Sequence, residues 1–385
     1  MERAKRGFVV VLDACGVGAL PDAEKYGDAG CNTLAHLAEA VGGLRLPALT
    51  RLGLGSILPL AGVARAERPA VHGKLHALGV GKDSTAGHWE LMGVVVDRPF
   101  PTYPDGFPPD VIEVIRMAGG RQVICNKPYN GIAAIDDFGA EHLRTGALIL
   151  YTSQDSVLQI AAHDQVVPAP ALHEICGWVR RELPAEHRVA RVIARPFRGE
   201  PGRFERTDGR KDYAVEPPSI SYLDVLQDAG VPVHTVGKAG QLFVGRGVDE
   251  QHPGATNLVA LEWTGRLLEE MEHGLVFTNL IETDQVYGHR HDMPGFVRAL
   301  EEIDAHVARW LDLLRPGDLL ILTADHGVDP TADHTDHTRE HVPLLAVWEG
   351  AEPRRHEGPM CDVGASVFKW LTGADSDALP GTPFL

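Results

Sequence analysis

Cysteine is scarce in this chain: there are five among 385 residues, at positions 15, 31, 125, 176 and 361. No two of them form a C-x-x-C pair, and an odd number leaves no closed disulfide framework. Few and unpaired cysteines are typical of proteins from reducing compartments. The pattern predicts a reduced, intracellular protein in which no cysteine is catalytic.

The sequence also lacks a long hydrophobic run near its amino terminus. Charged side chains at Glu2, Arg3, Lys5 and Arg6 precede a short apolar run, residues 8–12. That run is too short for the apolar region of a signal peptide or for a transmembrane helix, which needs about 20 apolar residues. We therefore expect a cytoplasmic protein.

Positive charge is in short supply, since 36 Lys and Arg stand against 53 Asp and Glu, a formal net charge of −17. This balance disfavours nucleic acid and anionic membrane surfaces as partners. An anionic small molecule remains possible where bound cations and a few basic side chains supply local positive charge. Nothing in the sequence indicates an obligate protein partner.

Imidazoles and carboxylates, in contrast, are concentrated in one segment. Residues 321–340 contain three His and four Asp directly behind an apolar run. Residues 319–323 have the pattern of a short buried strand, so Asp325 and His326 would leave its carboxyl end, where open α/β sheets bind their ligands. The segment predicts part of a metal site.

Two other apolar runs end in the same way. Residues 8–12 lead to Asp13, and residues 274–281 lead to Asp284 and His289. With His337 on the loop beyond Asp325 and His326, carboxylates and imidazoles of three strand ends would meet, a donor set that suits Mn²⁺ or Zn²⁺. Each Asp singly is explained as a helix N-cap, and each His as an ordinary polar group. Three such clusters together favour two metal ions.

Two adjacent metal ions usually serve displacement at phosphorus, which also needs a nucleophile. The stretch 81–90 places Ser84 and Thr85 at an expected helix start, where free backbone N–H groups can hold a phosphoryl group. Ser84 is our candidate nucleophile. The alternative is that Asp83, Ser84 or Thr85 only caps the helix.

Several motifs resemble the phosphopentomutase family of the alkaline phosphatase superfamily, in its metalloenzyme branch. They are Asp-Ser-Thr-Ala-Gly-His-Trp-Glu at 83–90, Tyr-Gly-His-Arg at 287–290, Ala-Asp-His-Gly at 324–327 and Thr-Asp-His-Thr-Arg-Glu at 335–340. Residues 13–23, 151–163 and 191–197 also resemble that family, so the resemblance covers nearly the whole chain. The last two stretches distinguish it from related families.

The resemblance implies a role for each candidate residue. One metal would be held by Asp13, Asp325, His326 and the Ser84 oxygen, and the other by Asp284, His289 and His337. The family usually has Thr where this chain has Ser84, so Thr85 remains a minor alternative as the phosphorylated group. Mn²⁺ would be the activating ion, and a sugar bisphosphate such as glucose 1,6-bisphosphate would prime the enzyme.

Substrate contacts are implied by the middle of the chain. Sugar contacts would come from Ser153, Asp155 and Val157, and phosphate contacts from Arg191, Ile193, Arg206 and Lys238. A planar guanidinium suits bidentate phosphate binding, and a carboxylate suits ribose hydroxyls. Each Arg has the alternative of a solvated surface side chain, and for Arg195 and Arg210 both interpretations stay open.

The expected fold is an α/β, alkaline-phosphatase-like core with a central, mostly parallel sheet between helices, plus a small inserted α+β cap. A chain of 385 residues favours two domains. Five Pro between positions 99 and 109, and the pair at 217–218, mark breaks in the chain. We expect residues 1–99 and 216–385 to form a discontinuous core and 100–215 the cap.

The resemblance implies an isomerase that interconverts α-D-ribose 1-phosphate and D-ribose 5-phosphate, and the 2-deoxy sugars, through a phosphoenzyme and a bisphosphate. Two alternatives remain at this point. One is a related metal-dependent phosphoglycerate mutase or phosphatase, because a two-metal site alone does not name the substrate. The other is a noncatalytic module that binds metal or sugar phosphate.

Overall fold

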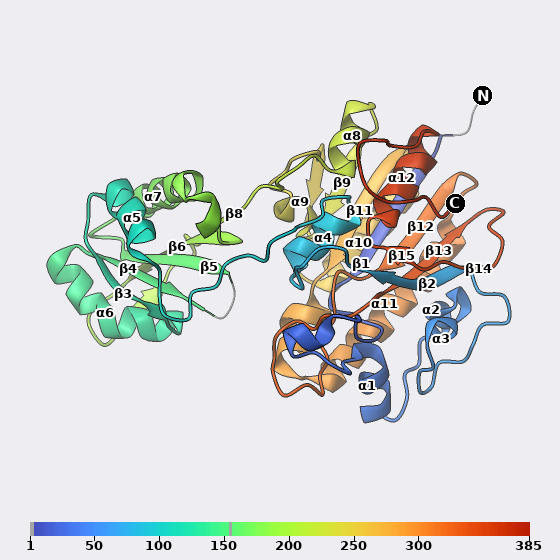
Figure 1. The fold of residues 1–385 in the computed structure, drawn as a ribbon, viewed down its shortest axis with the longest axis horizontal. Helices are drawn as coiled ribbons and strands as arrows, with labels where there is room; N and C mark the ends of the chain where they lie inside the picture. The colour runs from blue at the N-terminus through green and yellow to red at the C-terminus, as the bar shows by residue number, and fades with distance from the viewer. Residues whose placement is uncertain (1–3, 154–155) are drawn as a thin grey trace. The chain divides into compact units, whose positions relative to one another are not determined.

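A computed structural model describes residues 4–153 and 156–385 (Figure 1). The chain divides into two compact units: residues 1–98 with 217–385, here the core unit, and residues 99–216, here the inserted unit. The divisions fall at Pro99 and Pro217, in the Pro-rich stretches where the sequence predicts an insertion. Each unit has its own sheet and is described by itself.

Among the described residues, nine strands form the sheet of the core unit. Five neighbouring strands run parallel, in the order β10, β9, β11, β1 and β12. Next comes β13, antiparallel to both β12 and β2, and β14 and β15 pair with β2. The bounds are β1 Arg6–Leu12, β2 Val71–His76, β9 Val233–Val236, β10 Glu250–His252, β11 Gly274–Leu280, β12 Asp318–Thr323, β13 Val342–Trp348, β14 Arg354–Arg355 and β15 Gly358–Pro359.

The central strands are buried along their whole length, which explains their unbroken apolar sequences. Helix α12 packs on β1, β11 and β12, α10 packs on β9 and β11, and α11 packs on α10 and α2 (Figure 1). The predicted α/β fold with a mostly parallel central sheet is confirmed. The helix bounds are α1 Thr33–Ala40, α2 Pro47–Leu52, α3 Leu54–Ile57, α4 Ser84–Leu91, α8 Tyr222–Asp228, α9 Ala239–Leu242, α10 Asn257–Glu270, α11 Met293–Leu313 and α12 Asp362–Thr372.

The inserted unit is a small α+β structure. Its described strands pair in the order β3, β4, β5, β6 and β7, with β8 on β6, in a mixture of parallel and antiparallel pairs. The bounds are β3 Val123–Pro128, β4 Leu148–Thr152, β5 Val157–His163, β6 Arg191–Arg198, β7 Glu205–Arg206, β8 Lys211–Ala214, α5 Pro109–Gly119, α6 Gly131–Thr145 and α7 Ala169–Glu182.

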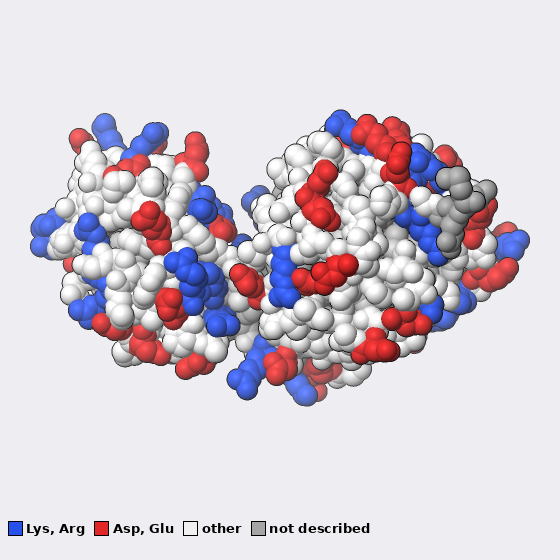
Figure 2. Space-filling view, turned by 90° about the horizontal axis from the view of Figure 1, so that it is seen from above, with Lys and Arg blue, Asp and Glu red and all other residues white. Residues whose placement is uncertain are grey.

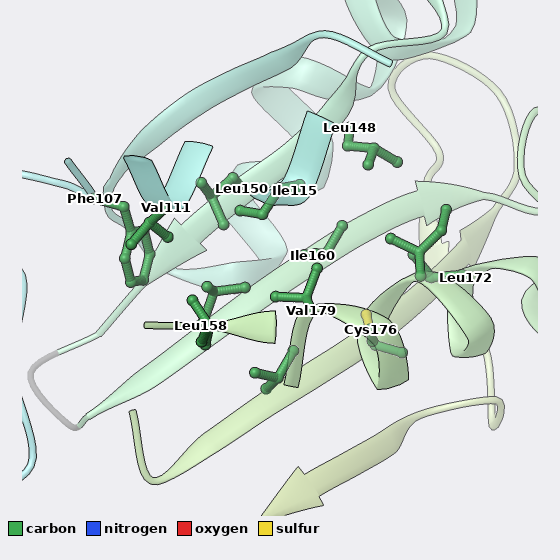
Figure 3. Close-up of a cluster of buried hydrophobic side chains, with 14 of the residues drawn as sticks. Phe107, Val111, Ile115, Leu148, Leu150, Leu158, Ile160, Leu172, Cys176 and Val179 are labelled. Carbon is green, nitrogen blue, oxygen red and sulfur yellow. The ribbon is translucent and has the colours of Figure 1, made fainter. Parts of the chain in front are cut away.

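Alternate residues of β4 separate two cores in this unit. Leu148 and Leu150 face α5 and α7, where they meet Ile115 and Val179 (Figure 3). Tyr151 instead belongs to the cluster beneath α6. Because successive strand residues point to opposite faces, one short apolar strand serves both clusters.

The surface carries charges of both signs. Figure 2 shows Lys and Arg interspersed with Asp and Glu on the face that it draws. None of the described helices is both long enough and apolar enough to cross a membrane.

A buried ion pair fixes the start of β1 beside β12. The Arg6 guanidinium donates to both Asp318 carboxylate oxygens, at 2.7 and 2.5 Å. It also donates to the carbonyl oxygens of Leu268 and Met271, both at 2.8 Å. Each charged side chain is 2 % exposed. The pair holds the two strands side by side at the end opposite to their carboxyl termini.

Replacing Asp318 by Ala leaves the Arg6 charge buried without a counter-ion. We expect the variant to lose about 3–5 kcal/mol of unfolding free energy. Urea unfolding followed by circular dichroism measures it. The matched control is Asp375→Ala, which removes the exposed partner of Lys369 at 2.7 Å and should cost at most about 1 kcal/mol. Equal losses in the two variants would contradict this account of the buried pair.

Candidate metal centre

Neighbouring strands bring the predicted ligands to one edge of the core sheet. Strand β1 lies between β11 and β12, parallel to both, with Leu12 opposite Leu280 and Val11 opposite Thr323. Their carboxyl ends therefore lie at the same level, and Asp13, Asp284 and Asp325 each follow within four residues. This register explains why residues more than 300 positions apart meet.

Asp13, Asp325 and His326 form the first ligand group, and all three are buried. The Nε2 atom of His326 lies 3.3 Å from Asp13 Oδ1 and 3.3 Å from Asp325 Oδ2. One nitrogen and two carboxylate oxygens thus face a common point, the donor set expected for a divalent ion such as Mn²⁺ or Zn²⁺.

Asp284, His289 and His337 form the second group. The Oδ1 atom of Asp284 lies 3.3 Å from His289 Nε2 and 3.4 Å from His337 Nε2. The His337 ring is also 4.1 Å from the His326 ring, centroid to centroid, so the two groups adjoin. All six predicted metal ligands are therefore together in the core unit.

The buried oxygens of these groups fit metal ions. Within the described part of the chain, Asp13 Oδ1, Asp284 Oδ1 and Asp325 Oδ2 are buried, and their near neighbours are imidazole nitrogens, at 3.1 to 3.4 Å, and not regular hydrogen-bond donors. Burying an ionised carboxylate without a partner is costly, and coordination to a cation removes that cost. The orphaned oxygens are the same atoms that face the imidazole nitrogens.

The pKa shifts of the ligand residues also favour the binding of a cation. Burial, followed by the charges of Asp325 and Asp284, raises the pKa of Asp13 to about 6. For His326, burial lowers the pKa, but Asp325 and Asp13 outweigh it and the net shift is well upward. The carboxylates thus repel one another and attract a proton to the imidazole. A bound divalent ion would take the place of that positive charge.

Two residues that support the ligands were not found from the sequence. The Asn279 side-chain N–H₂ donates to Asp13 Oδ2 at 2.9 Å, and His88 Nδ1 lies 3.1 Å from Asp325 Oδ2. Both are buried. Asn279 lies within strand β11, where it resembles an ordinary core polar residue, and only the register of β11 on β1 shows its role.

Ser84 lies at the start of helix α4, beside the first ligand group. Its Oγ atom is 3.1 Å from His326 Nε2. The N-cap of this helix is Asp83, which accepts from the backbone N–H groups of Thr85 and Ala86 at 3.0 and 3.1 Å. Ser84 is therefore not the capping residue. The expectation that free N–H groups here hold a phosphoryl group is wrong for these two, because Asp83 already accepts from them.

Comparison with known proteins shows the family to which this chain belongs. Residues 5–373 match the model of the metalloenzyme superfamily. Curated relatives include a phosphopentomutase of Desulfitobacterium hafniense, 46 % identical over 95 % of this chain and 96 % of its own length. Another, from Anaeromyxobacter sp. (strain K), is 48 % identical over 99 % of this chain and 98 % of its own. The chain belongs to the phosphopentomutase family.

Solved structures that are more distant in sequence share the fold. A phosphoglycerate mutase of Leishmania mexicana aligns with a TM-score of 0.53 at 14 % identity, covering 99 % of this chain and 98 % of its own. The PH0037 protein of Pyrococcus horikoshii aligns with a TM-score of 0.51 at 13 % identity, covering 98 % and 99 %. These likenesses show that the chain shares the fold of both proteins.

Of the substrate-binding candidates implied by the phosphopentomutase resemblance, Lys238 lies in the core unit. It follows β9, the neighbour of β11, and its ammonium group donates to the side chain of Gln285. Gln285 is next to Asp284 in the chain. A positive charge therefore stands beside the second ligand group.

The other candidates lie in the inserted unit, and Asp155 is outside the described residues. Val157 and Ile193 are buried, 3 % and 2 % exposed, so their side chains pack in the interior of the unit. Ser153 follows β4 and is partly exposed. Arg191 begins β6 and lies 3.7 Å from Asp212.

Three arginines gather near Tyr151 in the same unit. Burial, and then the charge of Arg210, lowers the pKa of Arg195, and Arg206 adds to the effect. Arg195 donates to Gln159 at 3.1 Å. The Arg206 guanidinium lies against Gly131. A side chain at position 131 would displace it, because a Cβ atom there would be only 2.1 Å from the guanidinium. Arg195 is therefore a partly buried residue of strand β6 and does not lie in a solvated loop.

We expect Asn279→Ala to weaken divalent metal binding about 10- to 100-fold, the usual effect of losing a partner of a metal ligand. The physical reason is that Asp13 loses the donor that orients its carboxylate. Isothermal titration of the metal-free variant with Mn²⁺ measures the affinity. Thr264→Val is the control, since it removes a buried hydroxyl 2.8 Å from Thr278 in the same region of β11 without touching a ligand. Unchanged affinity in Asn279→Ala would show that Asp13 needs no such support.

Proposed function

We propose that this protein is a phosphopentomutase, an isomerase that interconverts α-D-ribose 1-phosphate and D-ribose 5-phosphate, and the corresponding 2-deoxy sugars. The observation that carries the proposal is the position of Ser84, whose hydroxyl lies 3.1 Å from His326 beside two adjoining ligand groups. A nucleophile in that place suits phosphoryl transfer. Membership of the phosphopentomutase family supports the choice of substrate.

Two divalent ions, proposed as Mn²⁺, would be held by the two ligand groups. Asp13, Asp325, His326 and the Ser84 oxygen would bind one, and Asp284, His289 and His337 the other. When bound, such a pair supplies charge neutralisation for the transferred phosphoryl group and favours ionisation of the attacking hydroxyl. The orphaned carboxylate oxygens support this assignment.

The Ser84 side chain carries the phosphoryl group in the proposed cycle. In the first step the bond from phosphorus to Ser84 Oγ breaks, and one to the 5-oxygen of ribose 1-phosphate forms, which gives the 1,5-bisphosphate. The bisphosphate then turns end for end. In the second step the 1-phosphoryl group moves to Ser84 Oγ and ribose 5-phosphate leaves. The proton lost from the 5-hydroxyl is regained at the 1-hydroxyl.

Because the cycle begins from the phosphorylated protein, an outside donor must prime it. We propose that a sugar bisphosphate such as glucose 1,6-bisphosphate transfers one phosphoryl group to Ser84. The same chemistry then supports priming and the second step of turnover, since in both a sugar bisphosphate donates a phosphoryl group to Ser84. The reaction would take place in the cytoplasm.

The inserted unit, residues 100–215, is proposed as a cap that binds the sugar phosphate and excludes water. Its contacts would come from Ser153, Asp155, Val157, Arg191, Ile193 and Arg206, with Lys238 from the core. Because the side chains of Val157 and Ile193 are buried, contacts of these two residues with the sugar phosphate would come from their backbone atoms. The arginines near Tyr151 supply positive charge that suits a phosphate group.

Ser84→Ala tests the nucleophile. We expect mutase turnover to fall by at least about 10³-fold, because no covalent intermediate forms, while the number of bound metal ions stays the same as in the wild type. The matched control is Thr85→Ala, which removes the neighbouring hydroxyl and should keep activity within about tenfold of the wild type. Substantial turnover in Ser84→Ala, or its loss in Thr85→Ala alone, would move the phosphorylated group to Thr85.

The reaction itself is tested by incubating the protein with ribose 1-phosphate and Mn²⁺, with and without glucose 1,6-bisphosphate. We expect ribose 5-phosphate to appear, faster with the bisphosphate, and no free phosphate, because the phosphoenzyme is shielded from water. Chelation of the metal should stop the reaction. Free phosphate as the main product would identify a phosphatase instead, and neither product would favour a binding role or another substrate.

A further inference from the structure

A third group of ligand-type side chains lies at the edge of the core sheet, in strands other than those that carry the proposed catalytic ligands. His234 belongs to β9, and Glu250 and His252 belong to β10. The strands are parallel, with Glu250 opposite His234. Residues two apart on a strand share a face, so all three side chains project from the same side of the sheet.

Three atoms of this group face one another. His234 Nδ1 is 3.0 Å from His252 Nε2, and Glu250 Oε2 is 3.8 Å from each of these two nitrogens. A point equidistant from the three atoms lies about 2.1 Å from each, within the range of Zn–N and Zn–O bonds. The atoms are therefore spaced as the ligands of one small cation.

The surroundings favour a bound ion over ordinary hydration. The two imidazole side chains are only 14 % and 11 % exposed, whereas the Glu250 side chain is 63 % exposed. On its inner side, His252 packs against Trp263 of α10, with 4.9 Å between ring centroids. Protein atoms thus cover the group on its inner side, whereas the Glu250 side is exposed to solvent. A metal ion can reach the group from that side, and a water ligand has room there.

The simpler interpretation is a hydrogen bond between two imidazoles. It accounts for the 3.0 Å distance between the nitrogens and for the parallel rings, 2° apart with centroids 5.3 Å apart, but it gives no partner to the Glu250 carboxylate. Glu250 Oε2 is equally far from both nitrogens and beyond hydrogen-bond distance of either. Only a species placed between all three atoms interacts with the three of them at once.

We propose that His234, Glu250 and His252 bind a divalent transition-metal ion of the Zn²⁺ class, in addition to the two ions of the catalytic centre. Two imidazoles and one carboxylate are a donor set that zinc uses in proteins, with water completing the tetrahedron. The ion joins β10, a three-residue edge strand, to β9. It protects an exposed strand edge that only one neighbouring strand covers.

Metal counting tests the proposal without reference to catalysis. The intact protein, loaded with Zn²⁺ and dialysed, is weighed by native mass spectrometry. We expect three ions per chain in the wild type, and two in each of His234→Ala and His252→Ala. His273→Ala, which removes an exposed His outside the group, is the control and should retain three.

Two ions in the wild type, or three in both His variants, would overturn the proposal. Glu250→Gln gives an independent measurement that does not depend on a buried substitution. It should weaken binding of the third ion at least about tenfold in competition with a zinc dye, as loss of one ligand requires. Unchanged competition would also overturn it. Because mutase activity does not enter either measurement, an inactive protein that binds the third ion would contradict the proposed function alone.

Discussion

The burial of three carboxylates at one sheet edge is the constraint on which the rest of this molecule depends. Burial is the main cause of the raised pKa of Asp13 there, and the charges of Asp325 and Asp284 add to it. The parallel register of β11, β1 and β12 nevertheless holds the three carboxylates together. That arrangement is stable only with positive charge between the carboxylates. The surrounding histidines and bound cations supply this charge, which allows the apolar strands to bring the carboxylates together.

Much of this was predictable from the sequence, because unbroken apolar runs that end in Asp have few structural explanations. The runs 8–12, 274–281 and 319–323 are strands in the structure, within two residues at each end. All six predicted ligands meet. A strand that is buried on both faces has an unbroken apolar sequence and can be recognised from it. The residues that follow the run then lie at the carboxyl end of the strand, where ligands bind.

What escaped prediction depends on pairing between distant segments. Asn279 and His88 contact ligands only because β11 lies on β1 and α4 lies beside the end of β12, and no local pattern records that. The capping role of Asp83 was one of three possibilities at the sequence level, and the hydrogen bonds decide it. His234 and His252 are 18 residues apart and belong to different strands, so only the register of β9 and β10 brings them together.

The order of the strands in the chain also has a consequence for synthesis. Strand β1 precedes every other described strand in the chain, yet both of its partners, β11 and β12, come after residue 273, and so does Asp318, the partner of Arg6. The inserted unit, in contrast, is a continuous stretch whose own sheet is complete once residue 216 has been made. On the ribosome the sheet of the inserted unit can therefore form before β1 has either of its neighbouring strands. During translation the apolar strand β1 therefore remains without its neighbours until β11 and β12 have been made, which exposes it to aggregation and to chaperones.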